Sequence, residues 1–195
     1  MQAFHGTLQK ASMQRDADGT TVAPMNAPLP TAAPQVRAAR QAEVVQALQQ
    51  VLPAQALLWH TEDTTPYECD GLTAYRQRPL AVCLPATEAQ VQAVLRTCHR
   101  PGVPVVARGT GLSGGAMPHA LGVILSLARF NRILAIDPAS RTARVQCGVR
   151  NLAISEAAAP HNLYYAPDPS SQIACTIGGN IAENSGGVHC LKYGL

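Results

Sequence analysis

Apolar residues recur at helical spacing in the first part of the chain that shows a regular pattern. A helix is predicted to begin near Val36, because Val44 and Leu48 fall on one face, four residues apart. Pro53 is expected to end this helix, since proline lacks the backbone N–H that a helix interior needs. The polar, irregular stretch 61–78 that follows predicts a connecting loop.

A strand, a helix and a second strand are predicted next. The apolar run 80–84 is typical of a buried strand, and the β-branched run 103–107 is typical of another. Between them, Thr87 and Gln90 have the spacing of a capping box, in which two side chains satisfy free N–H groups at a helix start. Gly102 stands where a helix C-cap is expected. Together these elements predict a βαβ unit whose two strands form a parallel pair.

The pattern changes after this unit. A short strand is predicted at 123–127, and the strand-like runs 133–136 and 141–146 are joined by an Asp-Pro turn typical of an antiparallel hairpin. A helix is expected over 151–159, with Asn151 as its N-cap. A parallel lobe followed by a mixed or antiparallel lobe predicts the α+β fold class.

Composition and charge narrow the classes of protein. The 195 residues carry a formal net charge of +3 and contain no run of Lys or Arg, which excludes a dedicated nucleic-acid surface. The apolar stretches are too short to span a bilayer, and the N-terminus lacks the apolar core of a secretion signal. The six cysteines form no CxxC pair and are expected to be reduced and mostly buried.

Two glycine-rich segments carry the candidate chemistry. The first, 108–115, directly follows a predicted strand, and the second comprises 176–180 and 184–187. Glycine lets neighbouring backbone N–H groups point into one concavity, which binds phosphate oxygens without lysine. Both segments add hydroxyls or amides and almost no charge, apart from Arg108. Two such segments favour a long ligand with a diphosphate centre. The alternative for each segment is a tight turn between strands that binds no ligand.

A nicotinamide cofactor is the competing interpretation of the first segment. Gly109, Gly111 and Gly114 match the dinucleotide-binding fingerprint. That fold, however, needs a helix that opens at the loop. Pro118 and the strand predicted from Val123 leave too few residues for such a helix. The sequence therefore favours a flavin over a nicotinamide.

Four stretches resemble a known family of flavoproteins. Residues 67–76, 108–116, 123–134 and 149–195 are similar to the FAD-linked oxidases whose flavin domain is of the vanillyl-alcohol-oxidase, or PCMH, type. That family includes glycolate oxidase subunits and D-lactate dehydrogenases. The resemblance runs from about residue 36 to the last residue. It implies a two-lobed FAD-binding domain, with FAD lying between two α+β lobes.

The resemblance also implies which residues contact FAD. The first glycine-rich segment would wrap the diphosphate, and later residues would line the flavin and its ribityl–diphosphate path. The candidate cofactor-binding residues are Arg108, Gly109, Thr110, Gly111, Leu112, Ser113, Gly114, Gly115, Pro167, Asp168, Ser170, Thr176, Gly178, Gly179, Asn180, Asn184, Ser185 and Gly186. No catalytic residue and no metal ligand is predicted in this chain.

The family's reaction is the oxidation of a small 2-hydroxy acid, such as glycolate or D-lactate, to the 2-oxo acid. A hydride reaches flavin N5, and the electrons pass to a partner or a quinone pool. Relatives that attach FAD covalently carry His where this chain has Ala116, so non-covalent FAD is expected. The first segment is two residues shorter than the family's usual R-G-A-G-T-G-L-S-G-G. The shorter loop changes where its N–H groups lie, and so changes their contacts with the diphosphate. Cys147 replaces the usual proline, and we expect only a minor packing effect.

The expected organisation has three parts: a disordered tail over 1–35, a helix and connecting segment over 36–78, and a partial FAD-binding domain over 79–195. Because the chain ends inside the family's flavin domain, the second lobe is expected to be incomplete and the substrate domain absent. The intact protein would then be an enzyme, and this chain alone would show no turnover. The alternative is a truncated, catalytically inactive flavin-binding or degenerate fragment.

The resemblance extends to partners and location. It implies a small 2-hydroxy acid substrate, a second flavin-domain subunit and an iron-sulfur subunit, and no nucleic acid. The expected location is the cytoplasm, with at most peripheral association at the inner face of the membrane.

Overall fold

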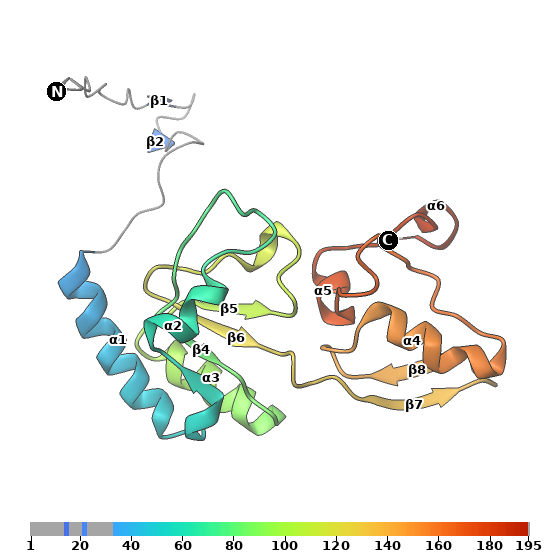
Figure 1. Cartoon of the computed structure of the whole chain (residues 1–195), viewed down its shortest axis with the longest axis horizontal. Helices are drawn as coiled ribbons and strands as arrows, with labels where there is room; N and C mark the ends of the chain where they lie inside the picture. Colours follow the sequence, from blue (N-terminus) through green and yellow to red (C-terminus); the bar gives the residue numbers. More distant parts are fainter. Residues whose placement is uncertain (1–13, 16–20, 23–32, 195) are drawn as a thin grey trace. The chain divides into compact units, whose positions relative to one another are not determined.

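The computed structural model describes residues 14–15, 21–22 and 33–194, and the chain divides into two units, Met1–Pro30 and Thr31–Leu195. In the first unit, the strands β1 (Gln14–Arg15) and β2 (Thr21–Val22) form an antiparallel pair. The rest of the tail predicted over 1–35 lies almost wholly outside the described residues. The second unit contains two lobes in sequence order (Figure 1).

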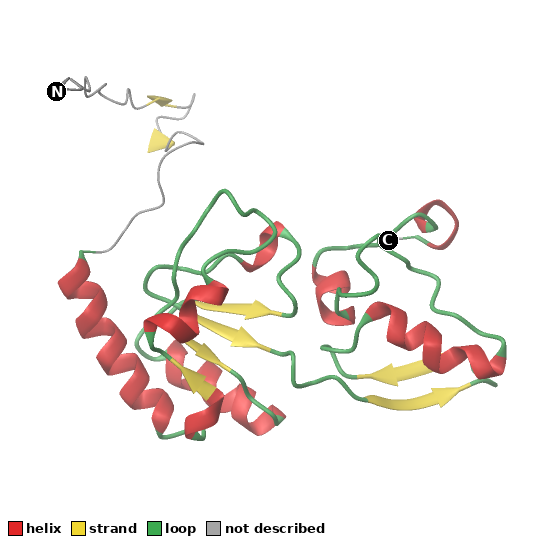
Figure 2. Ribbon diagram, viewed as in Figure 1, coloured by secondary structure: helices red, strands yellow, loops and turns green. Residues whose placement is uncertain are grey.

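The first lobe is a four-stranded sheet with helices. Its elements are α1 (Pro34–Gln49), η1 (Ala54–Ala56), β3 (Leu57–Leu58), α2 (Thr61–Thr64), η2 (Thr65–Tyr67), β4 (Ala81–Cys83), α3 (Glu88–His99), β5 (Val105–Arg108), η3 (Gly114–Ala116) and β6 (Val123–Ser126). The strand order is β3-β4-β6-β5, with β3 antiparallel to β4 and the other neighbours parallel (Figure 2).

Two predictions for this lobe are wrong in an instructive way. The strands predicted at 80–84 and 103–107 are parallel, but β6 lies between them, so they do not pair. Strand pairing depends on contacts distant in sequence, which a local pattern does not encode. The stretch 61–78 also begins with a helical turn, α2, and the 3₁₀ turn η2 before it becomes a loop.

The core of the first lobe lies between the sheet and the helices α1 and α3. Leu48 from α1 and Val94 from α3 are fully buried against β4 and β6. The capping prediction for α3 is confirmed: Oγ1 of Thr87 accepts from N of Gln90 (3.3 Å). A capping box predicts that the Gln90 side chain accepts from N of Thr87. Instead, Oε1 of Gln90 accepts from N of Ala86, one residue earlier (2.7 Å). This packing fixes the end of β5, from which the first glycine-rich segment leaves.

The second lobe contains the predicted hairpin and short helices. Its elements are β7 (Ile133–Asp137), β8 (Thr142–Val145), α4 (Asn151–Ala158), η4 (Ala159–His161), α5 (Ile177–Ala182) and α6 (Cys190–Tyr193). The strands β7 and β8 pair antiparallel, and Oδ1 of Asp137 accepts from the N–H groups of Ala139 (3.0 Å) and Ser140 (3.1 Å), which supports the turn. Val149, Ile154 and Ile177 form its small core.

Asn151 does not cap α4 as predicted. The N-cap position is Arg150, and Asn151 is the first helical residue. Its side chain is fully buried and donates through Nδ2 to O of Pro167 (2.9 Å). Within the described part of the chain, every helix is too short or too polar to span a lipid bilayer.

Candidate cofactor site

A cavity of about 350 Å³ lies between the two glycine-rich segments. This volume is within the range of small-molecule sites in proteins. Most of the predicted cofactor-binding residues line it: Arg108, Gly109, Thr110, Gly111, Leu112, Ser113, Gly115, Thr176, Gly178, Gly179, Asn180 and Ser185. The structure thus brings together two segments that lie more than sixty residues apart in sequence.

The first segment is an open loop between β5 and β6. In the part of the chain that the structure describes, the backbone N–H groups of 109–113 donate no hydrogen bond. Gly111 has a φ of 70°, a left-handed conformation that a side chain disfavours. A row of unpaired N–H groups on such a backbone is the arrangement that binds anionic oxygens.

The side chain of Arg108 packs against this loop. Its Nη1 donates to O of Cys69 (2.7 Å), and its guanidinium lies 5.5 Å from the centre of the Tyr67 ring. A Cβ on Gly111 would collide with the guanidinium, so the loop backbone rests directly on the Arg108 side chain. Arg108 therefore places a positive charge in the cavity wall and also fixes the loop above it.

The first part of the second segment lies in a short helix, α5, that the sequence did not predict. Thr176 is the N-cap of α5, and its Oγ1 accepts from N of Gly179 (3.4 Å). Gly178 packs against Cys147, because its N donates to O of Cys147 (2.8 Å) and a Cβ would collide there. Asn180 is 6% exposed, and its Nδ2 has no hydrogen-bond partner within the described chain. An unpaired buried donor is costly, so this amide is suited to a ligand oxygen.

The two segments approach each other closely. A Cβ on Gly109 would collide with the hydroxyl of Thr176, and a Cβ on Gly115 would collide with the carboxylate of Glu183. Backbone donors from one lobe and the start of α5 from the other therefore face the same space. A ligand that enters it would contact both lobes.

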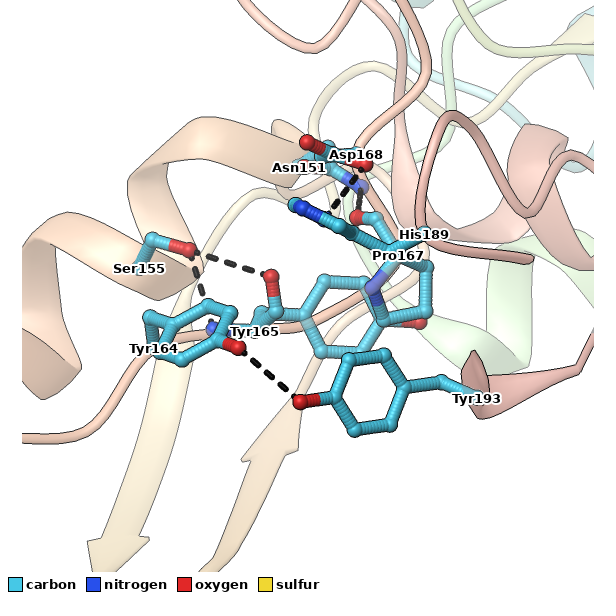
Figure 3. Close-up of polar contacts among 8 residues, drawn as sticks. All are labelled: Asn151, Ser155, Tyr164, Tyr165, Pro167, Asp168, His189 and Tyr193. Carbon is cyan, nitrogen blue, oxygen red and sulfur yellow. Dashed lines mark hydrogen bonds and ion pairs between the residues drawn. The ribbon is translucent and has the colours of Figure 1, made fainter. Parts of the chain in front are cut away.

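Six predicted residues do not line this cavity: Gly114, Pro167, Asp168, Ser170, Asn184 and Gly186. Figure 3 shows that Pro167 and Asp168 belong to a polar network within the second lobe. Oδ1 of Asp168 lies 3.1 Å from Nδ1 of His189, and N of Asp168 donates to O of Gly186 (3.2 Å). These residues join the turn after α4 to the segment before α6.

The sequence-based prediction missed several cavity residues, namely Ala107, Ala116, Leu127, Cys147, Ser171, Cys175, Ala182 and Glu183. Most are small or apolar and carry no signal of their own. Glu183 is the informative omission, because it brings a negative charge to a site predicted to be almost uncharged. Recognising 177–182 as a helix would have placed Glu183 one turn after Gly179, on the same side.

The donor set of this cavity fits FAD. Five backbone N–H groups, the Asn180 amide and the Arg108 charge suit a diphosphate, and the small residues leave room for its approach. Burial raises the pKa of the Cys147 thiol, so this side chain remains neutral beside the ligand.

Comparison of the fold with solved structures defines the class of protein. The chain superposes on p-cresol methylhydroxylase with a TM-score of 0.58 and 26% identity, covering 80% of this chain and 31% of that one. The fold is therefore the α+β flavin domain of the PCMH type.

Sequence comparison then gives the family. Residues 79–195 match the model of the FAD binding domain, so the chain belongs to this family of FAD-binding proteins. It is 66% identical over 154 residues to glycolate oxidase subunit GlcD of Escherichia coli, covering 78% of this chain and 31% of that protein. It is 32% identical over 155 residues to a D-lactate dehydrogenase of Anaerostipes hadrus, covering 78% of this chain and 32% of that protein. The chain thus spans about a third of the length of these relatives.

Proposed function

We propose that this chain supplies the FAD-binding part of a flavin-dependent oxidoreductase that oxidises a small 2-hydroxy acid, glycolate or D-lactate, to the 2-oxo acid. The observation that carries the proposal is the convergence of two glycine-rich segments on one cavity with unpaired donors. Similarity to a glycolate oxidase subunit and to a D-lactate dehydrogenase supports the substrate class.

The residues of this chain would bind and orient the cofactor. The N–H groups of 109–113 would donate to the diphosphate oxygens, and Nδ2 of Asn180 would donate to an oxygen from the opposite side. Ala116 is not a residue that bonds covalently to flavin, so FAD would be held without a covalent bond. When bound, FAD would supply the redox chemistry, namely a flavin acceptor for the hydride from the carbon that bears the substrate hydroxyl.

The remaining predicted residues are proposed to act in the same site. Pro167, Asp168, Ser170, Asn184 and Gly186 lie in the segments that flank α5 and would shape the approach of α5 to the flavin, and Gly114 would shape the first glycine-rich segment. As partners we propose the 2-hydroxy acid, a second flavin-domain subunit and an iron-sulfur subunit. The name of the Escherichia coli relative, a glycolate oxidase subunit, supports assembly into a larger enzyme.

Titration of the purified 195-residue chain with FAD tests the proposal. We expect flavin fluorescence to change saturably, and heat or acid to release the flavin. A chain that binds NAD and does not bind FAD, or that binds neither, would contradict the assignment.

Reduction of the bound flavin by glycolate or by D-lactate is measured separately. Because the chain spans about a third of its relatives, FAD binding without reduction would support the alternative of a flavin-binding chain that is inactive alone. Bleaching of the flavin by one of the two acids would identify the substrate.

A further inference from the structure

A short segment between η2 and β4, Cys69–Leu72, lies along the first glycine-rich segment. N of Gly71 donates to O of Ser113 (3.0 Å), and O of Cys69 accepts from Nη1 of Arg108 (2.7 Å). These two bonds connect the segment to the beginning and to the later part of the glycine-rich loop. The connection spans about forty residues of sequence, so it is a tertiary contact and not a local turn.

Asp70 provides the third connection. Its side chain is buried, with the residue 4% exposed. Oδ2 accepts from N of Ala116 (3.1 Å), at the end of the loop, and Oδ1 accepts from N of Leu72 (2.9 Å). A carboxylate is costly to bury unless hydrogen bonds compensate for lost water, and here both oxygens have backbone donors.

The backbones also approach closely at this point. A Cβ on Gly71 would collide with the carbonyl group of Leu112, and a Cβ on Gly114 would lie 2.8 Å from a methyl carbon of Leu72. The loop is therefore held at both ends while its central N–H groups, 109–113, stay free. A ligand that binds such a loop loses less conformational entropy than one that must order it first.

We propose that Asp70 is a positioning residue for the cofactor, which sets the direction of the N–H groups that receive the FAD diphosphate. The inference rests on the proposed function, because it assigns Asp70 a role in the same site. Asp70 itself does not line the cavity, so it acts through Ala116 and the loop. Both of its carboxylate oxygens accept from backbone N–H groups, which compensate for its negative charge within the protein.

The test compares Asp70→Asn with Glu68→Gln. Asparagine keeps the size of the side chain but replaces one acceptor oxygen by an N–H₂ group. Glu68 is two residues away, and its carboxylate forms a surface ion pair with Arg76 (2.7 Å), so Glu68→Gln is the matched control. FAD and riboflavin, which lacks the diphosphate, are titrated against each variant.

We expect Asp70→Asn to raise the dissociation constant of FAD about tenfold, as loss of one hydrogen bond to a charged group would. Riboflavin binding should change much less, and Glu68→Gln should match the wild type for both ligands. An equal loss of FAD and riboflavin binding, or no loss of either, would overturn the inference.

Hydrogen exchange of the ligand-free chain gives a second readout. Asp70→Asn should accelerate exchange of the bonded N–H groups of Gly71, Leu72 and Ala116, while α1 and α3 stay protected as in the wild type. Uniform acceleration would show that Asp70 serves only overall stability, and unchanged exchange would also overturn the proposal. If Asp70→Asn does not fold, Asp70→Ser, which can still cap the turn at Leu72, takes its place with the same expected result. Should the wild type not bind FAD, the proposed function fails, and hydrogen exchange still decides the role of Asp70.

Discussion

The two lobes of the second unit differ in how much apolar surface they bury. The first lobe has a core of fourteen buried residues that joins helices to a four-stranded sheet. The second lobe has a core of three, beneath a two-stranded hairpin. Several of the most exposed large apolar side chains also belong to the second lobe, including Ile181, Val188 and Leu191. The cofactor site therefore lies between a lobe with a large core and a lobe with a small one.

The two glycine-rich segments also differ, in their backbone conformation. The first keeps an open backbone because distant residues hold both of its ends. The second is held at its start by bonds from N of Ile177 to O of Val149 (2.8 Å) and from N of Gly178 to O of Cys147 (2.8 Å), and it winds into α5, capped by Thr176. Similar composition thus gives two structures, and what differs is the set of tertiary contacts.

The largest effect is expected from matched truncations in the two cores. Leu48→Ala should lower the free energy of unfolding by about 2–5 kcal/mol, because it leaves a cavity in a densely packed core. Ile154→Ala, also on a helix, should cost less, because its small cluster can relax around the missing atoms. Urea unfolding of each variant measures both values. A larger loss of unfolding free energy for Ile154→Ala than for Leu48→Ala would show that the second lobe has the more tightly packed core.

A smaller effect is expected where the lobes meet. Gly109→Ala would push a methyl group into the Thr176 hydroxyl, and separating these groups should weaken FAD binding about tenfold, in line with the cost of overpacking. Gly102→Ala is the control, because it strains a left-handed glycine with no neighbour near its Cβ. Gly102→Ala should lower the melting temperature and leave the FAD affinity unchanged. Equal affinities for Gly109→Ala and wild type in a fluorescence titration would disprove close approach at this position.

The smallest effect concerns alkaline pH and the buried thiols of the first lobe. All six cysteines are free, and burial raises the pKa of Cys98 from 9.0 to about 11 and also raises the pKa of Cys83. Because the unfolded thiol ionises first, the stability from a neutral Cys98 is fully present below pH 9 and is lost as pH rises toward 11. Urea midpoints at pH 8 and pH 10 should therefore differ less for Cys98→Ala than for the wild type. Cys190→Ala, in the second lobe, should keep the wild-type difference.

The sequence was sufficient for most of the longer elements and for much of the site, but not for α2, η2 or α5. The strands near 123–127 and 133–146, the α3 cap and the α+β class follow from local patterns, and the glycine-rich segments border one cavity. The position of β6 between β4 and β5 did not follow, because it depends on long-range pairing. Asn151 has the residue type of an N-cap, but the buried bond to Pro167 takes its side chain elsewhere. The sequence alone assigns no role to Asp70, because the role proposed for it depends on a contact with residue 116, which is distant in sequence.

The unpaired N–H groups of 109–113 have a consequence for anyone who purifies this chain. N–H groups without a protein partner donate to water or to a buffer anion until a better acceptor binds. Inorganic phosphate carries the same oxygens as the diphosphate of FAD, so it competes for the same loop. The apparent affinity for FAD is therefore a property of the solution as well as of the protein, and it is lower in phosphate than in a buffer without oxyanions.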